Sequence, residues 1–174
     1  MKLSTLLILI LLGAAAYRYR SHIPGFPLPD ISYADVQGQT RSLSRPDKPA
    51  VVGFWIADCG YCENMMGALQ AVRQKYPEDK LDVVGLYLNE ASEADIAAAA
   101  QREGYAVTLA PAQKTQQLIE ALQSRFSIRG PGRDIYIVRR DGFFQRVATV
   151  DQEDDFRESS VVVPEVEAYI QKAL

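Results

Sequence analysis

The stretch that decides the fold reads Val51-Val52-Gly53-Phe54-Trp55-Ile56-Ala57-Asp58-Cys59-Gly60-Tyr61-Cys62. Its first half is an apolar run, which predicts a buried strand over residues 50–55. Its second half ends in Cys-x-x-Cys, and a helix-like pattern follows from residue 63 to about residue 76. A buried strand that leads into a helix whose first turn carries two thiols is typical of a redox dithiol.

The position of the two thiols predicts their roles. A helix N-terminus stabilises negative charge, so a cysteine placed there ionises more easily than a free thiol. Cys62 follows Cys59 by one helical turn, which is close enough for a disulfide. We therefore expect Cys59 to be the nucleophile and Cys62 to be the resolving thiol.

Two other interpretations of the cysteine pair stay open. A zinc site needs about four ligands, and beyond the two cysteines the chain offers one histidine, His22, unless a dimer supplies the rest. A static disulfide is the other alternative, although closing so short a loop adds little stability. The catalytic dithiol is favoured, and it requires neither a metal nor an organic cofactor.

Composition narrows the function classes. With 174 residues, of which 48% are hydrophobic, the chain is long enough for one globular domain with a sizeable core. The net charge is -3 and no long basic run is present, which gives no indication of nucleic-acid binding. A single histidine in the N-terminal tail argues against Ser/His or Cys/His catalysis.

The N-terminus resembles a targeting segment. Lys2 precedes an apolar run, Leu3 to Ala16, whose length suits a secretory signal and is short of the ~20 residues that span a bilayer. Cleavage after the alanines at 14–16 is one outcome; we favour an uncleaved anchor, because the Tyr-Arg-Tyr-Arg at 17–20 suits a membrane interface. The expected organisation is a signal or anchor at 1–20, a proline-rich linker at 21–29 and one domain at 30–174.

The remaining pattern predicts a mixed sheet with helices on both faces. Strands are expected at 31–33, 40–43, 50–55, 81–88, 105–109, 135–138 and 143–150, with hairpin turns at 37–39 and 139–142. Helices are expected after a capping box at Ser92, over 116–126, and from Pro164 in a first turn to 174. Residues 151–160 are expected to form a solvated loop.

From Pro29 onward the chain resembles thioredoxin-fold proteins, and more narrowly the membrane-anchored periplasmic thiol-disulfide oxidoreductases of the TlpA/ResA/DsbE kind. The resemblance rests on Pro29-Asp30 through Leu43, on Lys48-Pro49 with the Cys-x-x-Cys stretch, and on the strand and Asp-Gly turn of 135–142. It implies an α/β thioredoxin-like fold, a mixed central sheet flanked by helices, with an extra N-terminal β-hairpin.

The resemblance also implies a function. Cys59 and Cys62 would exchange disulfides with a partner protein and with an upstream redox partner, on the periplasmic side of the inner membrane or as a protein secreted to the periplasm. Reduction is the preferred direction. Cys-Gly-Tyr-Cys also occurs in DsbC-like isomerases, which carry a separate dimerisation domain. A thioredoxin-like binding or assembly module with weak or no redox turnover is the alternative. The supporting residues that the resemblance implies are Trp55, Asp58, Gly60, Tyr61, Gly130 and Pro131.

Three departures from the family pattern bear on the chemistry. Asp58 stands where a tryptophan usually precedes the first cysteine, and a carboxylate beside a thiol disfavours the thiolate. Gly53 and Met65 stand where related proteins place acids that assist the second thiol. Pro131 is out of register for the proline that usually lies opposite the dithiol, and its place could be filled by a neighbouring residue.

Overall fold

A computed structural model of the chain describes residues 26–27, 32–34, 39–44, 46–88, 91–105, 108–110, 132–152, 155–156 and 158–174. Its centre is a six-stranded mixed sheet with the order β1-β8-β7-β4-β5-β6. The strands are β1 Phe26–Pro27, β4 Ala50–Trp55, β5 Asp82–Tyr87, β6 Thr108–Ala110, β7 Asp134–Val138 and β8 Phe143–Thr149.

The strand that leads to the dithiol, β4, lies inside the sheet. It pairs in parallel with β5 and antiparallel with β7, so Gly53 faces Gly85 on one side and Ile135 on the other. Every residue of β4 is buried, which explains why its sequence is a continuous apolar run rather than an alternating one.

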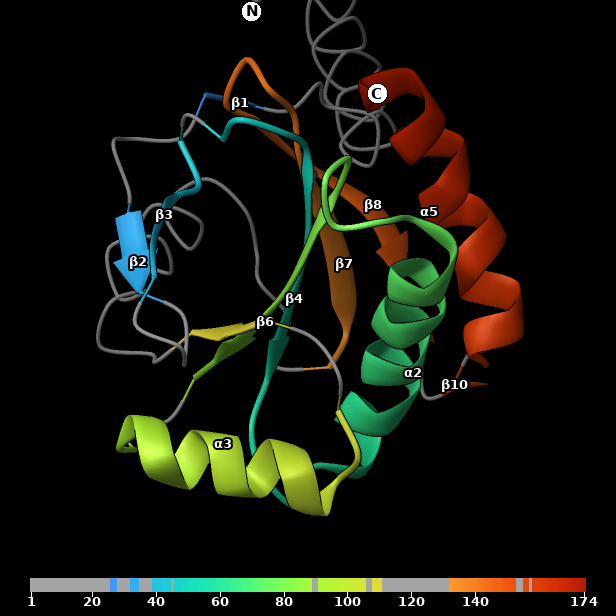
Figure 1. Cartoon of the computed structure of the whole chain (residues 1–174). Coiled ribbons are helices and arrows are strands. Elements are labelled where there is room, and N and C mark those ends of the chain that lie inside the picture. Colours follow the sequence, from blue (N-terminus) through green and yellow to red (C-terminus); the bar gives the residue numbers. More distant parts are fainter. Residues whose placement is uncertain are drawn as a thin grey trace, which may run out of the picture.

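Two helices cover one face of the sheet. Figure 1 shows α2 (Gly60–Lys75) and α5 (Ser159–Ala173) side by side on this face. Their inner residues, Leu69 and Val166 among them, join Val51 and Trp55 in the larger core cluster. A third helix, α3 (Glu93–Arg102), crosses the end of the sheet near the first turn of α2 (Figure 1).

A smaller core cluster fills the opposite face. Phe54 packs edge-on against Tyr136, and Tyr136 stacks on Phe144 with 4.7 Å between the ring centroids. The expected N-terminal hairpin is present, with β2 (Ser32–Ala34) antiparallel to β3 (Thr40–Ser42). The α/β thioredoxin-like fold expected from the sequence is therefore confirmed.

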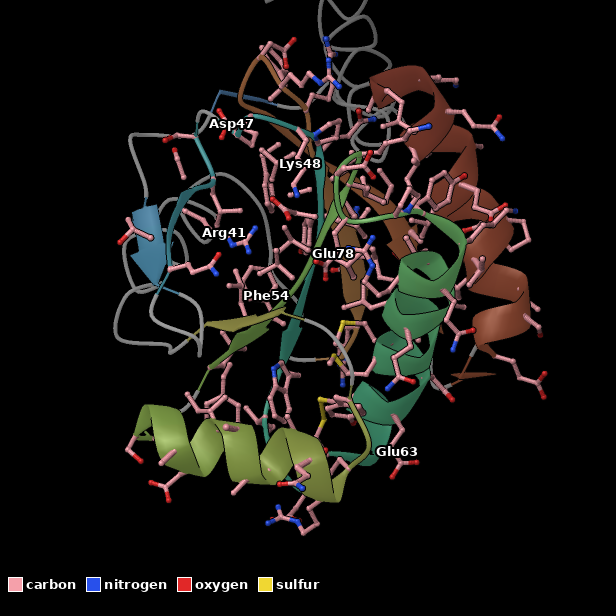
Figure 2. The ribbon with its side chains drawn as sticks, viewed as in Figure 1. Arg41, Asp47, Lys48, Phe54, Glu63 and Glu78 are labelled. Atoms are coloured by element: carbon pink, nitrogen blue, oxygen red, sulfur yellow. A yellow bond between two sulfur atoms is a disulfide. The ribbon has the colours of Figure 1, made fainter. Side chains whose placement is uncertain are left out.

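Two ion pairs join the hairpin and the segment after it to the sheet. Asp82 Oδ1, at the start of β5, lies 3.0 Å from Arg41 Nη1 and 3.0 Å from Lys48 Nζ. Figure 2 labels both cations on the side of the sheet away from α2. This contact lies at the end of β4 that is remote from the cysteines.

Most expected strands and helices are found close to their predicted places, and the helix boundaries need two corrections. α2 begins at Gly60 rather than Glu63, because the helix starts within the Cys-x-x-Cys motif itself. α5 begins at Ser159, so Pro164 lies inside the helix rather than in its first turn. Burial of Val162, one turn before Val166, extends the apolar stripe toward the N-terminus and outweighs the one backbone hydrogen bond that proline cannot donate.

Two further differences concern strands. Residues 151–160 were expected to form a loop, but β9 (Asp151–Gln152) pairs antiparallel with β10 (Asp155–Phe156) before α5 begins. β1, which falls in the stretch expected to be a linker, pairs with β8 at the edge of the sheet. An edge strand accepts Pro27 because the missing donor can face away from the ladder.

Several expectations lie outside the described residues: the targeting segment at 1–20, the helix at 116–126, Gly130 and Pro131. Among the described residues, none of the helices combines the length and the apolar character that crossing a membrane requires.

Candidate active site

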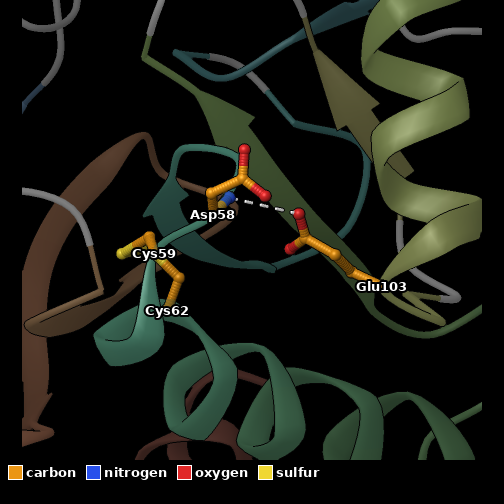
Figure 3. The surroundings of a disulfide bond; sticks show 4 residues. All are labelled: Asp58, Cys59, Cys62 and Glu103. Atoms are coloured by element: carbon orange, nitrogen blue, oxygen red, sulfur yellow. Dashed lines mark hydrogen bonds between the residues drawn. A yellow bond between two sulfur atoms is a disulfide. The ribbon is translucent and has the colours of Figure 1, made fainter.

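The dithiol follows the C-terminal end of β4, with three residues between Trp55 and Cys59. The backbone N–H of Leu88 donates to Trp55 O at 2.9 Å, which keeps β4 and β5 together up to this point. The chain then turns through residues 56–58, and Cys59 becomes the N-cap of α2, with the Cys62 N–H donating to its carbonyl at 2.9 Å. Cys59 and Cys62 form a disulfide with their Cα atoms 5.3 Å apart (Figure 3).

The two sulfur-bearing residues differ in exposure. Cys59 is partly exposed at the N-cap, whereas Cys62 is fully buried in the core cluster with Met65 and Met66. A partner protein can therefore approach Cys59, while Cys62 is shielded behind it. This asymmetry suits one attacking and one resolving thiol.

Asp58 holds an unusual backbone conformation. Its φ is 55°, and among the described residues no other non-glycine residue has a positive φ. Aspartate tolerates this left-handed region better than most residues. Its side chain is 89% exposed and lies 3.7 Å from Arg102 Nη2, so its charge is largely solvated.

The C-terminal end of α3 contacts this turn. The Asp58 N–H donates to Glu103 Oε1 at 3.4 Å (Figure 3), and Arg102 Nη2 lies 3.6 Å from the same oxygen. Gln70 Nε2 of α2 donates to Gly104 O at 2.9 Å. The end of α3 is thus joined both to the turn before Cys59 and to the helix that carries the cysteines.

Three aromatic residues pack together next to the turn that precedes Cys59. Trp55 is fully buried and packs edge-on against Tyr105 and Tyr87, with centroid distances of 5.3 and 4.8 Å. Trp55 Nε1 and Tyr105 Oη are buried without a hydrogen-bond partner among the described residues. Burial raises the pKa of Tyr105, and the nearby Glu103 carboxylate raises it further, so the phenol stays neutral.

The two positions where the resemblance places acids hold Gly53 and Met65, and neither side chain is acidic. Met65 is fully buried and its thioether packs against Gly53. Glu63, the acid nearest in sequence, is exposed on α2 (Figure 2). Among the described residues, no group of three or more His, Cys, Asp or Glu side chains comes together as metal ligands.

The remaining expected site residues have different outcomes. Gly60 opens α2 and is exposed, and a Cβ built on it would meet nothing within 4 Å. Tyr61 lies in the first turn of α2. Gly130 and Pro131 are outside the described residues, but the next residue, Gly132, donates its N–H to Phe54 O at 2.7 Å. The segment after Pro131 therefore reaches the end of β4 that leads to the cysteines.

The sequence did not single out Arg102, Glu103, Tyr105 or Gln70. Glu103 and Asp58 are separated by 45 positions, and no motif joins them. The only local signal was that α3 ends near Gly104, which has the positive φ of 74° that suits a helix C-terminus.

These features define a thioredoxin-like domain with a disulfide at the N-terminus of α2. Comparison with known families agrees: residues 24–147 match the AhpC/TSA family, which covers more than half of the chain. The chain belongs to the AhpC/TSA family, and it carries the Cys59–Cys62 disulfide at the N-terminus of α2.

Solved structures with this fold carry related descriptions. The thioredoxin domain of a thiol-disulfide oxidoreductase from Bacteroides vulgatus is 22% identical with a TM-score of 0.61, covering 85% of this chain and 98% of that one. A thiol:disulfide interchange protein of the thioredoxin family from Chlorobium tepidum is 19% identical with a TM-score of 0.62, covering 85% and 98%. A secreted Mycobacterium tuberculosis disulfide oxidoreductase, homologous to Escherichia coli DsbE, is 17% identical with a TM-score of 0.56, covering 80% and 96%.

Proposed function

We propose that this protein reduces disulfides of partner proteins by thiol-disulfide exchange, with Cys59 as the nucleophile and Cys62 as the resolving thiol. The observation that carries the proposal is the Cys59–Cys62 pair at the N-terminus of α2, with Cys59 accessible and Cys62 buried. The exchange uses sulfur chemistry alone.

The reaction proceeds in two displacements. The Cys59 thiolate attacks one sulfur of the partner disulfide, that S–S bond breaks, and the leaving sulfur takes up a proton. A mixed disulfide now joins Cys59 to the partner. Cys62 then loses its proton and attacks Cys59 Sγ, which releases the second partner thiol. Two electrons have passed to the partner, and an upstream redox protein must restore the dithiol.

The surroundings of Cys59 support reduction as the direction. Asp58 precedes the cysteine, and the Glu103 carboxylate binds the Asp58 N–H. Negative charge beside a thiol disfavours the thiolate. Because strong oxidants stabilise their reduced, thiolate form, this environment favours electron donation instead.

The proposed location is the periplasmic side of the inner membrane. The apolar run of the first 16 residues with the Tyr-Arg-Tyr-Arg that follows supports an anchor or export signal. The Mycobacterium tuberculosis structure with this fold is described as secreted. An exported domain would meet partner proteins that carry disulfides.

An insulin-reduction assay on the full chain tests the proposal. The wild type should precipitate insulin in the presence of dithiothreitol faster than the reductant does alone, and Cys59→Ser should return the rate to that background. Cys62→Ala should accumulate a mixed disulfide through Cys59, which mass spectrometry can identify. A measured potential near the ~-120 mV of a strong oxidant would overturn the reducing direction.

One observation favours a second candidate function. Within the part of the chain that the structure describes, the two positions where the resemblance places an acid near Cys62 hold Gly53 and Met65, which suits a thioredoxin-like binding or assembly module whose dithiol turns over slowly. Equal and negligible insulin reduction by the wild type and by Cys59→Ser would support that module.

A further inference from the structure

We propose that Glu103 is a positioning residue for Cys59, which binds the peptide of the preceding residue and makes the dithiol a stronger reductant. This inference rests on the proposed function, because it assigns a way of setting the redox potential of the same two cysteines. The hydrogen bond of Glu103 is to the backbone N–H of Asp58 and not to either cysteine. Glu103 therefore acts on Cys59 through Asp58.

The contact is made next to the nucleophile. Glu103 Oε1 accepts the backbone N–H of Asp58 at 3.4 Å, and Asp58 is joined to Cys59 by one peptide bond. Consecutive Cα atoms are about 3.8 Å apart, so the carboxylate lies close to the helix N-terminus on which Cys59 depends. Figure 3 shows Glu103 reaching Asp58 from the side opposite Cys59.

The carboxylate is held on a rigid support. Glu103 caps α3, and its N–H donates to Ala99 O at 3.0 Å. The following residues are fixed too, since Gly104 O accepts Gln70 Nε2 and Tyr105 packs against Trp55. Its side chain is only 18% exposed, against 89% for that of Asp58. The charge of Glu103 is therefore less screened by water than that of its neighbour.

The electrostatic consequence has a definite sign. Free N–H groups at the start of α2 stabilise a Cys59 thiolate. Glu103 engages one nearby N–H and adds a negative charge, while Arg102 supplies the opposing positive charge to the same group. The thiolate exists in the reduced dithiol and not in the disulfide. A carboxylate that disfavours it lowers the reduction potential, and a cation that favours it raises the potential.

Two substitutions separate this role from a structural one. Glu103→Gln keeps an oxygen acceptor for the Asp58 N–H but removes the charge, so the potential should rise. Arg102→Gln removes the cation, which is 59% exposed, so the potential should fall. We expect each to change the equilibrium constant with glutathione about threefold, which corresponds to about 14 mV. A loss of packing alone would not move the two potentials in opposite directions.

The measurement is equilibration of the full chain in glutathione buffers, read out by the fraction of disulfide. Glu78→Gln is the matched control, because Glu78 is an exposed acid in the turn between α2 and β5, remote from the cysteines (Figure 2); it should leave the potential unchanged. Should Glu103→Gln fail to fold, Arg102→Gln carries the test. Unchanged potentials, or shifts of the same sign, would overturn the inference while wild-type insulin reduction stood. Absence of exchange in the wild type would instead overturn the proposed function.

Discussion

Gly53 and Met65 share one volume of the core: a Cβ added to Gly53 would overlap Met65 Sδ and would lie 3.0 Å from Leu69 Cδ1. Both residues stand where the resemblance described above would place an acid, and in the structure they pack against each other. The methionine thioether fills the space that a side chain on β4 would need. Met65 and Cys62 belong to the same apolar core cluster.

Adding a methyl group at Gly53 should destabilise the fold unless Met65 is shortened. We expect Gly53→Ala to reduce the free energy of unfolding by about 1–2 kcal/mol, because over-packing a filled core forces side chains to move. Met65→Ala should cost about 2–4 kcal/mol through the cavity that it leaves. Urea denaturation of both variants gives the two values.

The double variant decides whether the two residues compete for the same space. In Gly53→Ala with Met65→Ala the new methyl group enters the vacated volume, so the total loss should be smaller than the sum by about 0.5 kcal/mol or more. Additive losses would contradict a shared volume.

The unequal burial of the cysteines predicts unequal reactivity. After reduction, iodoacetamide should modify Cys59 at least roughly tenfold faster than Cys62, since reactivity follows access and thiolate character. Cys59 is partly exposed and Cys62 is fully buried. Timed quenching followed by peptide mass spectrometry measures both rates. Equal rates in the folded protein would argue against the assigned roles, and equal rates in urea provide the control.

Asp58 combines a charge with a left-handed backbone, and substitutions can separate the two. Asp58→Asn keeps the tolerance for a φ of 55° and removes the charge, so stability should change by less than about 0.5 kcal/mol. Its reduction potential should rise, as expected for an anion that disfavours the Cys59 thiolate. Asp58→Val should instead lose about 1–2 kcal/mol through backbone strain. Glutathione equilibration and urea denaturation of both variants check the pair, and an unchanged potential in Asp58→Asn would remove Asp58 from the case for reduction.

Asp82 should matter for the hairpin and not for the chemistry. It lies 3.0 Å from both Arg41 Nη1 and Lys48 Nζ, so Asp82→Asn leaves two cations facing each other. We expect a loss of about 1–2 kcal/mol and faster proteolysis near residues 39–44. Insulin reduction at a temperature well below unfolding should equal that of the wild type, because Asp82 pairs with the start of β4 and the cysteines follow its end. Reduced insulin turnover would show that the hairpin contributes to the site.

The sequence predicted the parts of the fold that depend on local signals. The apolar run of β4, the capping box at Ser92 and the Asp-Gly turn before β8 all appear where their patterns placed them. Boundaries were less predictable where long-range packing competes with a local signal. Pro164 marked a helix start by its own preference, but burial of Val162 moved that start to Ser159.

The residues of the site were also predictable only where a local sequence pattern marks them. Cys59 and Cys62 were apparent because their spacing matches one helical turn. The contact of Glu103 with the Asp58 N–H was not, because it joins the end of α3 to a turn 45 positions earlier. Such a contact is created by the packing of α3 across the end of the sheet, which no local pattern records.

Tyr105 offers a test of the buried surroundings of the dithiol by pH. Burial raises its pKa above the usual 10.0, so above pH 10 the unfolded chain loses this proton while the folded chain keeps it. The unfolded state then binds fewer protons, and the contribution of Tyr105 to stability falls as pH rises. Tyr105→Phe lacks this ionisation, so its stability relative to the wild type should increase between pH 9 and pH 11. Near pH 7 the substitution should change stability by less than about 1 kcal/mol, because the gain from removing a buried hydroxyl is offset by losing its favourable interaction with the nearby Glu103 carboxylate. Urea denaturation of both proteins across this range gives the difference, in which the titration of Lys75 and of the other tyrosines cancels. A difference independent of pH would show that Tyr105 ionises in the folded protein as readily as in the unfolded chain.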